Sequence, residues 1–100
     1  MHNIVSYIKK EDLLICQFDG RLDSVVSEII EDDLLNHVLD ASCATVFDFK
    51  NVDYVSSAFL RICVKAARIT PSMKVDIINA SPEIKEVYEM TGLERIFEFK

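Results

Sequence analysis

The sequence that decides the fold runs from Thr45 to Ile69 and reads TVFDFKNVDYVSSAFLRICVKAARI. Residues 45–49 are rich in β-branched and aromatic side chains, which is typical of a short buried strand. The polar pair at 50–51 predicts a turn after that strand. Apolar residues then recur at helical spacing, so we expect a helix over about 57–69.

Two serines, Ser56 and Ser57, stand between this strand and this helix. A serine immediately before a helical pattern can cap the helix, because its hydroxyl accepts a hydrogen bond from an unpaired backbone N–H. A helix start also carries a partial positive charge that favours an anion. From these residues alone we read Ser57 as a cap, at a position where an anion such as a phosphate, with a charge of roughly −1.5 to −2, would be stabilised.

The chain before this stretch predicts a hairpin followed by a helix. Residues 4–8 and 13–18 have the pattern of two antiparallel strands joined by a charged turn, and the second strand ends at 19–20. Asp23 or Ser24 can then cap a helix. The spacing predicts that this helix places six apolar residues near one face, namely Val26, Ile29, Ile30, Leu34, Val38 and Leu39.

The chain after this stretch predicts a strand, a helix and an edge strand. Thr70-Pro71 stops the preceding helix, because proline disfavours helical backbone in the residue before it. Residues 75–78 form another buried strand, which a right-handed crossover through the helix at 57–69 makes parallel to the strand at 45–49. Ser81 begins a helix that Gly92 can close in the left-handed conformation, and 96–99 form the last strand.

Length and composition fit one small domain. One hundred residues, half of them hydrophobic, suit a single α/β domain over 1–100, with a mixed central sheet and helices in the order ββαβαβα(β). A net charge of −6 without a basic cluster argues against a nucleic-acid partner. The sequence has no long apolar run and no recognisable signal peptide, so we expect no direct membrane insertion.

The cysteines and histidines point to no particular chemistry. Cys16, Cys43 and Cys63 are odd in number and widely spaced, which fits neither a disulfide framework nor a zinc site. Cys16 and Cys63 fall in apolar patterns and are read as buried residues of a protein in the reducing cytoplasm. No motif places His2 or His37 near the serine pair, and no glycine loop could hold a phosphate. We therefore expect a cytoplasmic protein that is not an enzyme and binds no cofactor or metal.

Three stretches carry a resemblance to a known family. They are FDGRLD at 18–23, VFDFKNVDYVSSAFLRI at 46–62 and VDIINASPEIKEVYEMTGLERIF at 75–97. In this order they cover almost the whole chain, and they resemble STAS domains, the anti-sigma factor antagonist family. Two positions depart from the family pattern, because Ser56 replaces a common aspartate and Phe59 replaces a glycine.

The resemblance implies a regulatory switch. Ser57 aligns with the serine that family members phosphorylate reversibly. The unphosphorylated form would bind an anti-sigma factor that is also a serine kinase and so free a sigma factor, and a PP2C-type phosphatase would reset the switch. Asp48 would lie near the phosphorylation loop. An alternative keeps the fold without the switch, as a scaffold or a transporter-associated subunit. The partner-binding residues that the resemblance implies are Asp23, Ser56, Ser57, Phe59, Leu60 and Arg61.

Phe59 can be read as a core residue or as an anchor on the docking face. Its helical spacing to Ile62, Cys63 and Ala66 favours the core. An exposed aromatic ring beside Ser57 would instead serve as an interface anchor. If Ser57 is the cap, Phe59 occupies the second helical position, and we expect a partly buried ring whose edge stays exposed.

Overall fold

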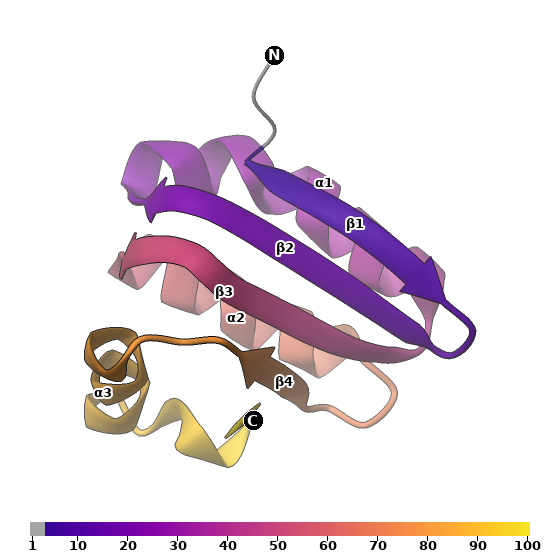
Figure 1. Cartoon of the computed structure of the whole chain (residues 1–100). Helices are drawn as coiled ribbons and strands as arrows, with labels where there is room; N and C mark the ends of the chain where they lie inside the picture. The colour runs from indigo at the N-terminus through magenta and orange to yellow at the C-terminus, as the bar shows by residue number, and fades with distance from the viewer. Residues whose placement is uncertain (1–3) are drawn as a thin grey trace.

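The computed structural model describes residues 4–100 as one α/β domain, which is shown in Figure 1. A five-stranded mixed sheet carries three α-helices, as the sequence predicts. In chain order the elements are β1 (Val5–Lys10), β2 (Leu13–Leu22), α1 (Ser24–Ala41), β3 (Ala44–Val55), α2 (Ser57–Ile69), β4 (Val75–Ile78), α3 (Pro82–Met90), the short 3-10 helix η1 (Leu93–Arg95) and β5 (Phe97–Phe99).

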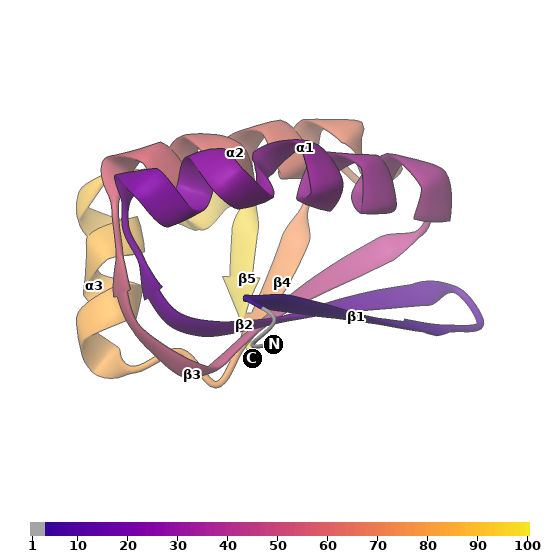
Figure 2. The same cartoon turned by 90° about the horizontal axis from the view of Figure 1, so that it is seen from above.

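The strands lie in the sheet in the same order as in the chain, from β1 to β5. β1 and β2 form the predicted antiparallel hairpin, and the pairs β2–β3, β3–β4 and β4–β5 are parallel. Figure 2 shows α1 and α2 side by side over one face of the sheet, with α3 beside the end where β2 and β3 finish. β3 is therefore the central strand, and α2 begins at its carboxyl end.

The core lies between the sheet and these two helices. Alternate residues of β2 and β3 face the helices, among them the buried side chains of Phe18, Phe47 and Phe49. The ring of Phe18 meets those of Phe47 and Phe49 edge-on, with centroids 5.0 and 5.7 Å apart. Aromatic pairs favour this edge-to-face geometry. The helices therefore rest on a tightly packed aromatic layer.

Two strands extend further than the sequence predicts. β3 continues through the predicted turn at 50–51 as far as Val55, and β2 continues past 19–20 as far as Leu22. The pairing register of β2 and β3 shifts twice near these positions, and Gly20 adopts a backbone φ of +94° that favours glycine. The predicted ends of both strands are wrong, because local irregularities of the ladder accommodate the polar residues without a turn.

The inner face of α1 is narrower than predicted. Ile30, Leu34 and Val38 are buried at four-residue spacing, whereas Ile29 is 67% exposed and Leu39 is 58% exposed. Each exposed residue lies five positions from Leu34, which is about 140° round a helix of 3.6 residues per turn. The prediction that Ile29 and Leu39 face the sheet is therefore wrong.

The end of α2 and both ends of α3 lie where the sequence predicts them. Thr70 follows the last residue of α2, and Ser81 caps α3 by accepting a hydrogen bond from the backbone N–H of Ile84 at 3.2 Å. Gly92 follows α3 with a left-handed φ of +74°. Of the helices within residues 4–100, none combines the length and the apolar character needed to cross a bilayer.

Thiol labelling tests the packing of α2. Cys16 and Cys63 are buried, and burial raises the pKa of each thiol to about 12, whereas Cys43 is partly exposed. Because the thiolate is the reactive form, we expect iodoacetamide to modify Cys43 alone in the native protein, and Cys16 and Cys63 only after unfolding. Mass spectrometry of the labelled peptides measures this. Rapid labelling of Cys63 in the native protein would show that this face of α2 is turned outward.

Candidate functional site

The candidate site lies where β2 and β3 end and α1 and α2 begin. Leu22 pairs with Val55 at the ends of the two strands, and the backbone N–H of Ser56 donates to the carbonyl oxygen of Leu22 at 3.0 Å. This pairing brings Asp23 and Ser56, the residues before the two helices, next to each other. The carboxyl ends of parallel strands are the usual position of binding sites in open α/β sheets.

Each of these two residues caps its helix. Asp23 Oδ1 accepts a hydrogen bond from the backbone N–H of Val26 at 2.9 Å, and Ser56 Oγ accepts one from the backbone N–H of Phe59 at 3.2 Å. Both caps satisfy backbone donors that have no partner within the helix. Ser56, where the resemblance expects an aspartate, is thus the cap of α2.

Ser57 is the first residue of α2 and not its cap. Ser56 keeps an extended backbone with φ −95° and ψ 167°, whereas Ser57 already belongs to the helix. The side chain of Ser57 is exposed, and its hydroxyl makes no hydrogen bond within residues 4–100. The reading of Ser57 as the cap is therefore wrong. The hydroxyl instead stands free at the positive end of a 13-residue helix.

Phe59 is a core residue at the third position of α2. Its side chain is 0% exposed, and its ring packs edge-on against Phe18 at 5.2 Å and lies 6.0 Å from Phe49. The core reading is confirmed, and the expectation of an exposed edge is wrong. Because Ser56 is the cap, Phe59 lies one position further into the helix than expected, and it has no surface with which to contact a partner.

The predicted docking residues therefore divide into two groups. Ser56 and Leu60 are buried like Phe59, each with 7% of its surface exposed. Ser57 and Arg61 are exposed, and Asp23 is partly exposed beside them. The accessible part of the predicted docking face consists of Asp23, Ser57 and Arg61. The buried residues Ser56, Phe59 and Leu60 pack beneath it.

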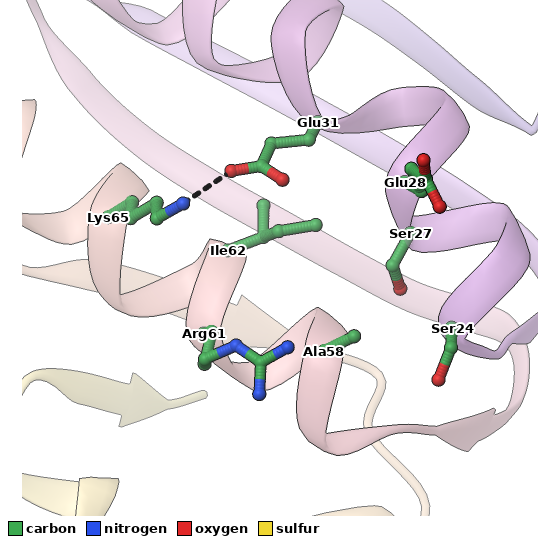
Figure 3. A pocket seen from close by; sticks show the side chains of 8 residues that line it. All are labelled: Ser24, Ser27, Glu28, Glu31, Ala58, Arg61, Ile62 and Lys65. Carbon is green, nitrogen blue, oxygen red and sulfur yellow. Dashed lines mark hydrogen bonds and ion pairs between the residues drawn. The ribbon is translucent and has the colours of Figure 1, made fainter.

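A polar groove runs between the first turns of α1 and α2, as Figure 3 shows. It has a volume of about 330 Å³. Lys65 Nζ lies 2.6 Å from Glu31 Oε2 and bridges the two helices, whereas Arg61 makes no ion pair within residues 4–100. The groove therefore holds one basic side chain that is available to a partner. Its lining residues are Ser24, Ser27, Glu28, Glu31, Ala58, Arg61, Ile62 and Lys65.

A second, shallow and mostly apolar groove lies on the other side of α2. It has a volume of about 270 Å³ and is lined by Ser57, Leu60, Arg61, Val64, Thr91 and Leu93. Arg61 lines both grooves, so it stands on a ridge between them. Ser57 lies one turn before Arg61 on this ridge. An open ridge flanked by shallow grooves suits the docking of another protein.

Sequence reasoning missed most residues that line these grooves. Lys65 and Glu31 are 34 positions apart, and Thr91 and Leu93 reach the second groove from the segment after α3. No local pattern joins residues so distant in the sequence. Ser57 and Arg61, which the family resemblance implied, are four residues apart on α2 and lie on the same exposed surface.

Asp48 lies away from this site. Because it alternates with Phe47 and Phe49, its side chain is on the sheet face opposite α2. Its carboxylate accepts hydrogen bonds from the backbone N–H of Lys50 at 3.0 Å and from Asn79 Nδ2 at 2.9 Å. The rest of β3, roughly 20 Å of extended chain, separates it from α2. The expectation that Asp48 lies near the phosphorylation loop is wrong.

The described histidine is also engaged elsewhere. The ring of His37 stacks on Tyr7 with centroids 3.6 Å apart, and its Nδ1 lies 2.8 Å from the carbonyl oxygen of Asp33. This contact is roughly 20 Å along α1 from the end where Ser57 lies. His2 lies outside the described residues. Within residues 4–100, no three His, Cys, Asp or Glu side chains are grouped in a way that could hold a metal ion.

The fold, with the exposed start of α2 at the end of the central strand, is that of a small α/β module. A model of the STAS domain matches residues 5–100, so the chain belongs to the STAS domain family. The prediction of this family from the three sequence stretches is confirmed.

Individual relatives agree with this assignment. The chain is 29% identical over 91 residues to the protein named anti-sigma factor antagonist BtrV of Bordetella bronchiseptica, a match that covers 89% of this chain and 78% of that relative. The solved structure of an anti-sigma factor antagonist from Mycobacterium paratuberculosis has a TM-score of 0.81 at 18% identity, over 95% of this chain and 82% of that one. The Bacillus protein SpoIIAA in its phosphorylated form has a TM-score of 0.71 at 14% identity, over 96% and 90%. At these identities the two structures show the fold alone.

Proposed function

We propose that this chain is an anti-sigma factor antagonist that is switched by reversible phosphorylation of Ser57. The observation that carries the proposal is the free, exposed hydroxyl of Ser57 at the first position of α2. Ser56 performs the capping, so modification of Ser57 removes no bond that the fold needs. Two relatives support the same reading, since BtrV is named an anti-sigma factor antagonist and SpoIIAA has been solved in a phosphorylated form.

The switch acts through charge on the docking face. A partner kinase transfers the γ-phosphoryl group of ATP to Ser57 Oγ, releasing ADP and a proton, and a PP2C-type phosphatase hydrolyses the ester to serine and inorganic phosphate. The phosphate adds a charge of roughly −1.5 to −2 at the positive end of α2. Because Ser57 and Arg61 are both exposed, this charge alters the ridge without repacking the core. In this proposal the chain is a cytoplasmic substrate and binding module, and the partners are the enzymes.

Substitutions at Ser57 test the switch. We expect Ser57→Ala to fold with unchanged stability, to accept no phosphate from the cognate kinase and to bind that partner constitutively. Ser57→Asp places a carboxylate on the ridge, and we expect it to weaken binding about tenfold, which corresponds to ~1.4 kcal/mol. Mass spectrometry of the peptide that contains Ser57 measures phosphorylation, and calorimetry measures the affinity.

Ser56→Ala is the matched control. It removes the helix cap, so we expect a loss of ~1 kcal/mol of unfolding free energy with phosphorylation of Ser57 retained. Phosphate transfer to the Ser57→Ala protein at the wild-type level would show that the assignment is wrong. Partner binding by a wild-type protein that no kinase modifies would favour the alternative, a non-switching STAS scaffold or a transporter-associated subunit.

A further inference from the structure

α1 has a second apolar face, directly opposite the face that it buries. Val25 is 68% exposed, and Ile29 and Leu39 are exposed to a similar degree. At about 100° per residue, these three positions fall within an arc of about 80° whose centre lies opposite Leu34. Single exposed apolar residues are common on protein surfaces, but three on one stripe of one helix are a candidate interaction surface. We call Val25, Ile29, Asp32, Asn36 and Leu39 the outer stripe.

The charges on α1 are all acidic. Residues 24–41 contain five aspartates and glutamates, and no lysine or arginine. Two of these acids are engaged away from the stripe, since Glu31 pairs with Lys65, and Asp33 accepts a hydrogen bond from the hydroxyl of Tyr7 at 3.1 Å. Three acids lie on or beside the outer stripe and are Glu28, Asp32 and Asp40.

The order of residues along the stripe describes its complement. Val25 and Ile29 lie one turn apart at one end, Leu39 lies at the other end, and the polar residues Asp32 and Asn36 lie between them. Among the described residues, Figure 2 shows no other element over the side of α1 that faces away from the sheet. We propose that the outer stripe is a docking surface for a basic amphipathic helix of a partner protein, which has apolar residues at both ends and lysine or arginine between them.

The charge pattern selects this occupant over two others. A second copy of the chain would place the acids of one α1 against those of another, and like charges brought together in an interface are repulsive. An anionic lipid surface attracts basic helices and repels acidic ones. A helix laid along α1 would follow the recognised mode in which apolar anchors of one helix meet those of another and flanking charges select the partner. The surface is separate from the ridge at Ser57, and the proposal does not depend on phosphorylation.

Two synthetic helical peptides test the proposal on the full chain. One has leucine pairs at both ends with lysines between them, and the other has glutamates in place of the lysines. In an NMR titration at physiological salt, we expect the lysine peptide to shift the backbone signals of the outer stripe and the glutamate peptide to shift none. We expect Ile29→Ser, which removes only apolar surface, and Asp32→Lys, which reverses one charge, each to weaken the lysine peptide about tenfold.

Met90→Ser is the matched control, because Met90 is 79% exposed on α3, away from the stripe. We expect this variant to bind the lysine peptide as the wild type does. Equal shifts at the exposed acids of α3, which are Glu83, Glu86 and Glu89, or unchanged binding by Ile29→Ser, would overturn the proposal in favour of unspecific charge attraction. A dimer in sedimentation that Ile29→Ser dissociates, or binding to phosphatidylserine vesicles that requires Ile29, would overturn it in favour of a second copy or a membrane. Unchanged melting temperatures confirm that the variants are folded.

Discussion

Replacement of Phe59 by alanine is expected to lower the free energy of unfolding by about 3–5 kcal/mol, the range for loss of a fully buried aromatic side chain. The ring is completely buried and packs against Phe18 and Phe49, so its removal leaves a cavity between α2 and the sheet. The surrounding rings belong to rigid strands and can close this cavity only in part. Because Phe59 lies in the first turn of α2, as Ser57 does, we expect the loss of packing to make the docking ridge less ordered as well.

Chemical denaturation monitored by circular dichroism measures this loss. Phe59→Leu is the conservative variant, and we expect it to cost less than half as much because it keeps most of the apolar volume. Tyr54→Ala is the matched exposed aromatic, since Tyr54 is 38% exposed and stacks with Arg21, and we expect it to cost less than about 1 kcal/mol. A loss below ~1 kcal/mol for Phe59→Ala would contradict the core position of this ring.

Replacement of Tyr88 by alanine is expected to be equally costly, about 3–5 kcal/mol. Tyr88 is fully buried, and its ring lies 5.2 Å from Phe97, 5.5 Å from Phe99 and 6.2 Å from Phe49. Its hydroxyl lies 3.3 Å from Cys63 Sγ in α2. One side chain of α3 thus contacts α2, β3 and β5, and its removal loosens the last part of the domain first.

Hydrogen exchange distinguishes this local loosening from uniform destabilisation. In Tyr88→Ala, we expect the amides of α3 and β5 to lose protection at lower denaturant than those of β2 and β3. Tyr88→Phe removes only the hydroxyl contact with Cys63, and we expect a loss of ~1 kcal/mol with the order of protection unchanged. Simultaneous loss of protection in every element of the alanine variant would show that α3 is not a separate unit.

The elements whose sequence patterns are strictly local could be predicted from the sequence. The helix α2 shows this, because Phe59, Ile62, Cys63 and Ala66 mark one face and Thr70-Pro71 marks its end. The length of β3 could not be predicted, because its continuation through the polar pair at 50–51 depends on pairing with β2. The buried face of α1 was predicted too wide, because the helix has more apolar residues than one face can bury.

In the candidate site, too, the sequence predicted the local features and not those that depend on tertiary structure. The position of the helix start identified Ser56 and Ser57, but which of them caps depends on the backbone angles at the end of β3. Because the cap is Ser56 and not Ser57, the hydroxyl of Ser57 is accessible and the ring of Phe59 is fully buried. A shift of one residue in the start of the helix therefore changes the environment expected for both side chains. The groove beside Arg61 could not be predicted, because α1 and α2 meet there only through the fold of the sheet.

The order of the strands has a consequence for how the domain assembles during synthesis. Each strand after the first pairs with the strand that immediately precedes it in the chain, so the sheet can grow one strand at a time as the polypeptide leaves the ribosome. Among the described strands, no early one has to wait, unpaired, for a partner from the far end of the chain. The hairpin β1–β2 is complete first, and α1 and β3 then cover and extend it. The groove between α1 and α2 is complete before α3 and β5 emerge, whereas the groove lined by Thr91 and Leu93 forms last. Such an order shortens the time in which unpaired strand edges are exposed to other nascent chains.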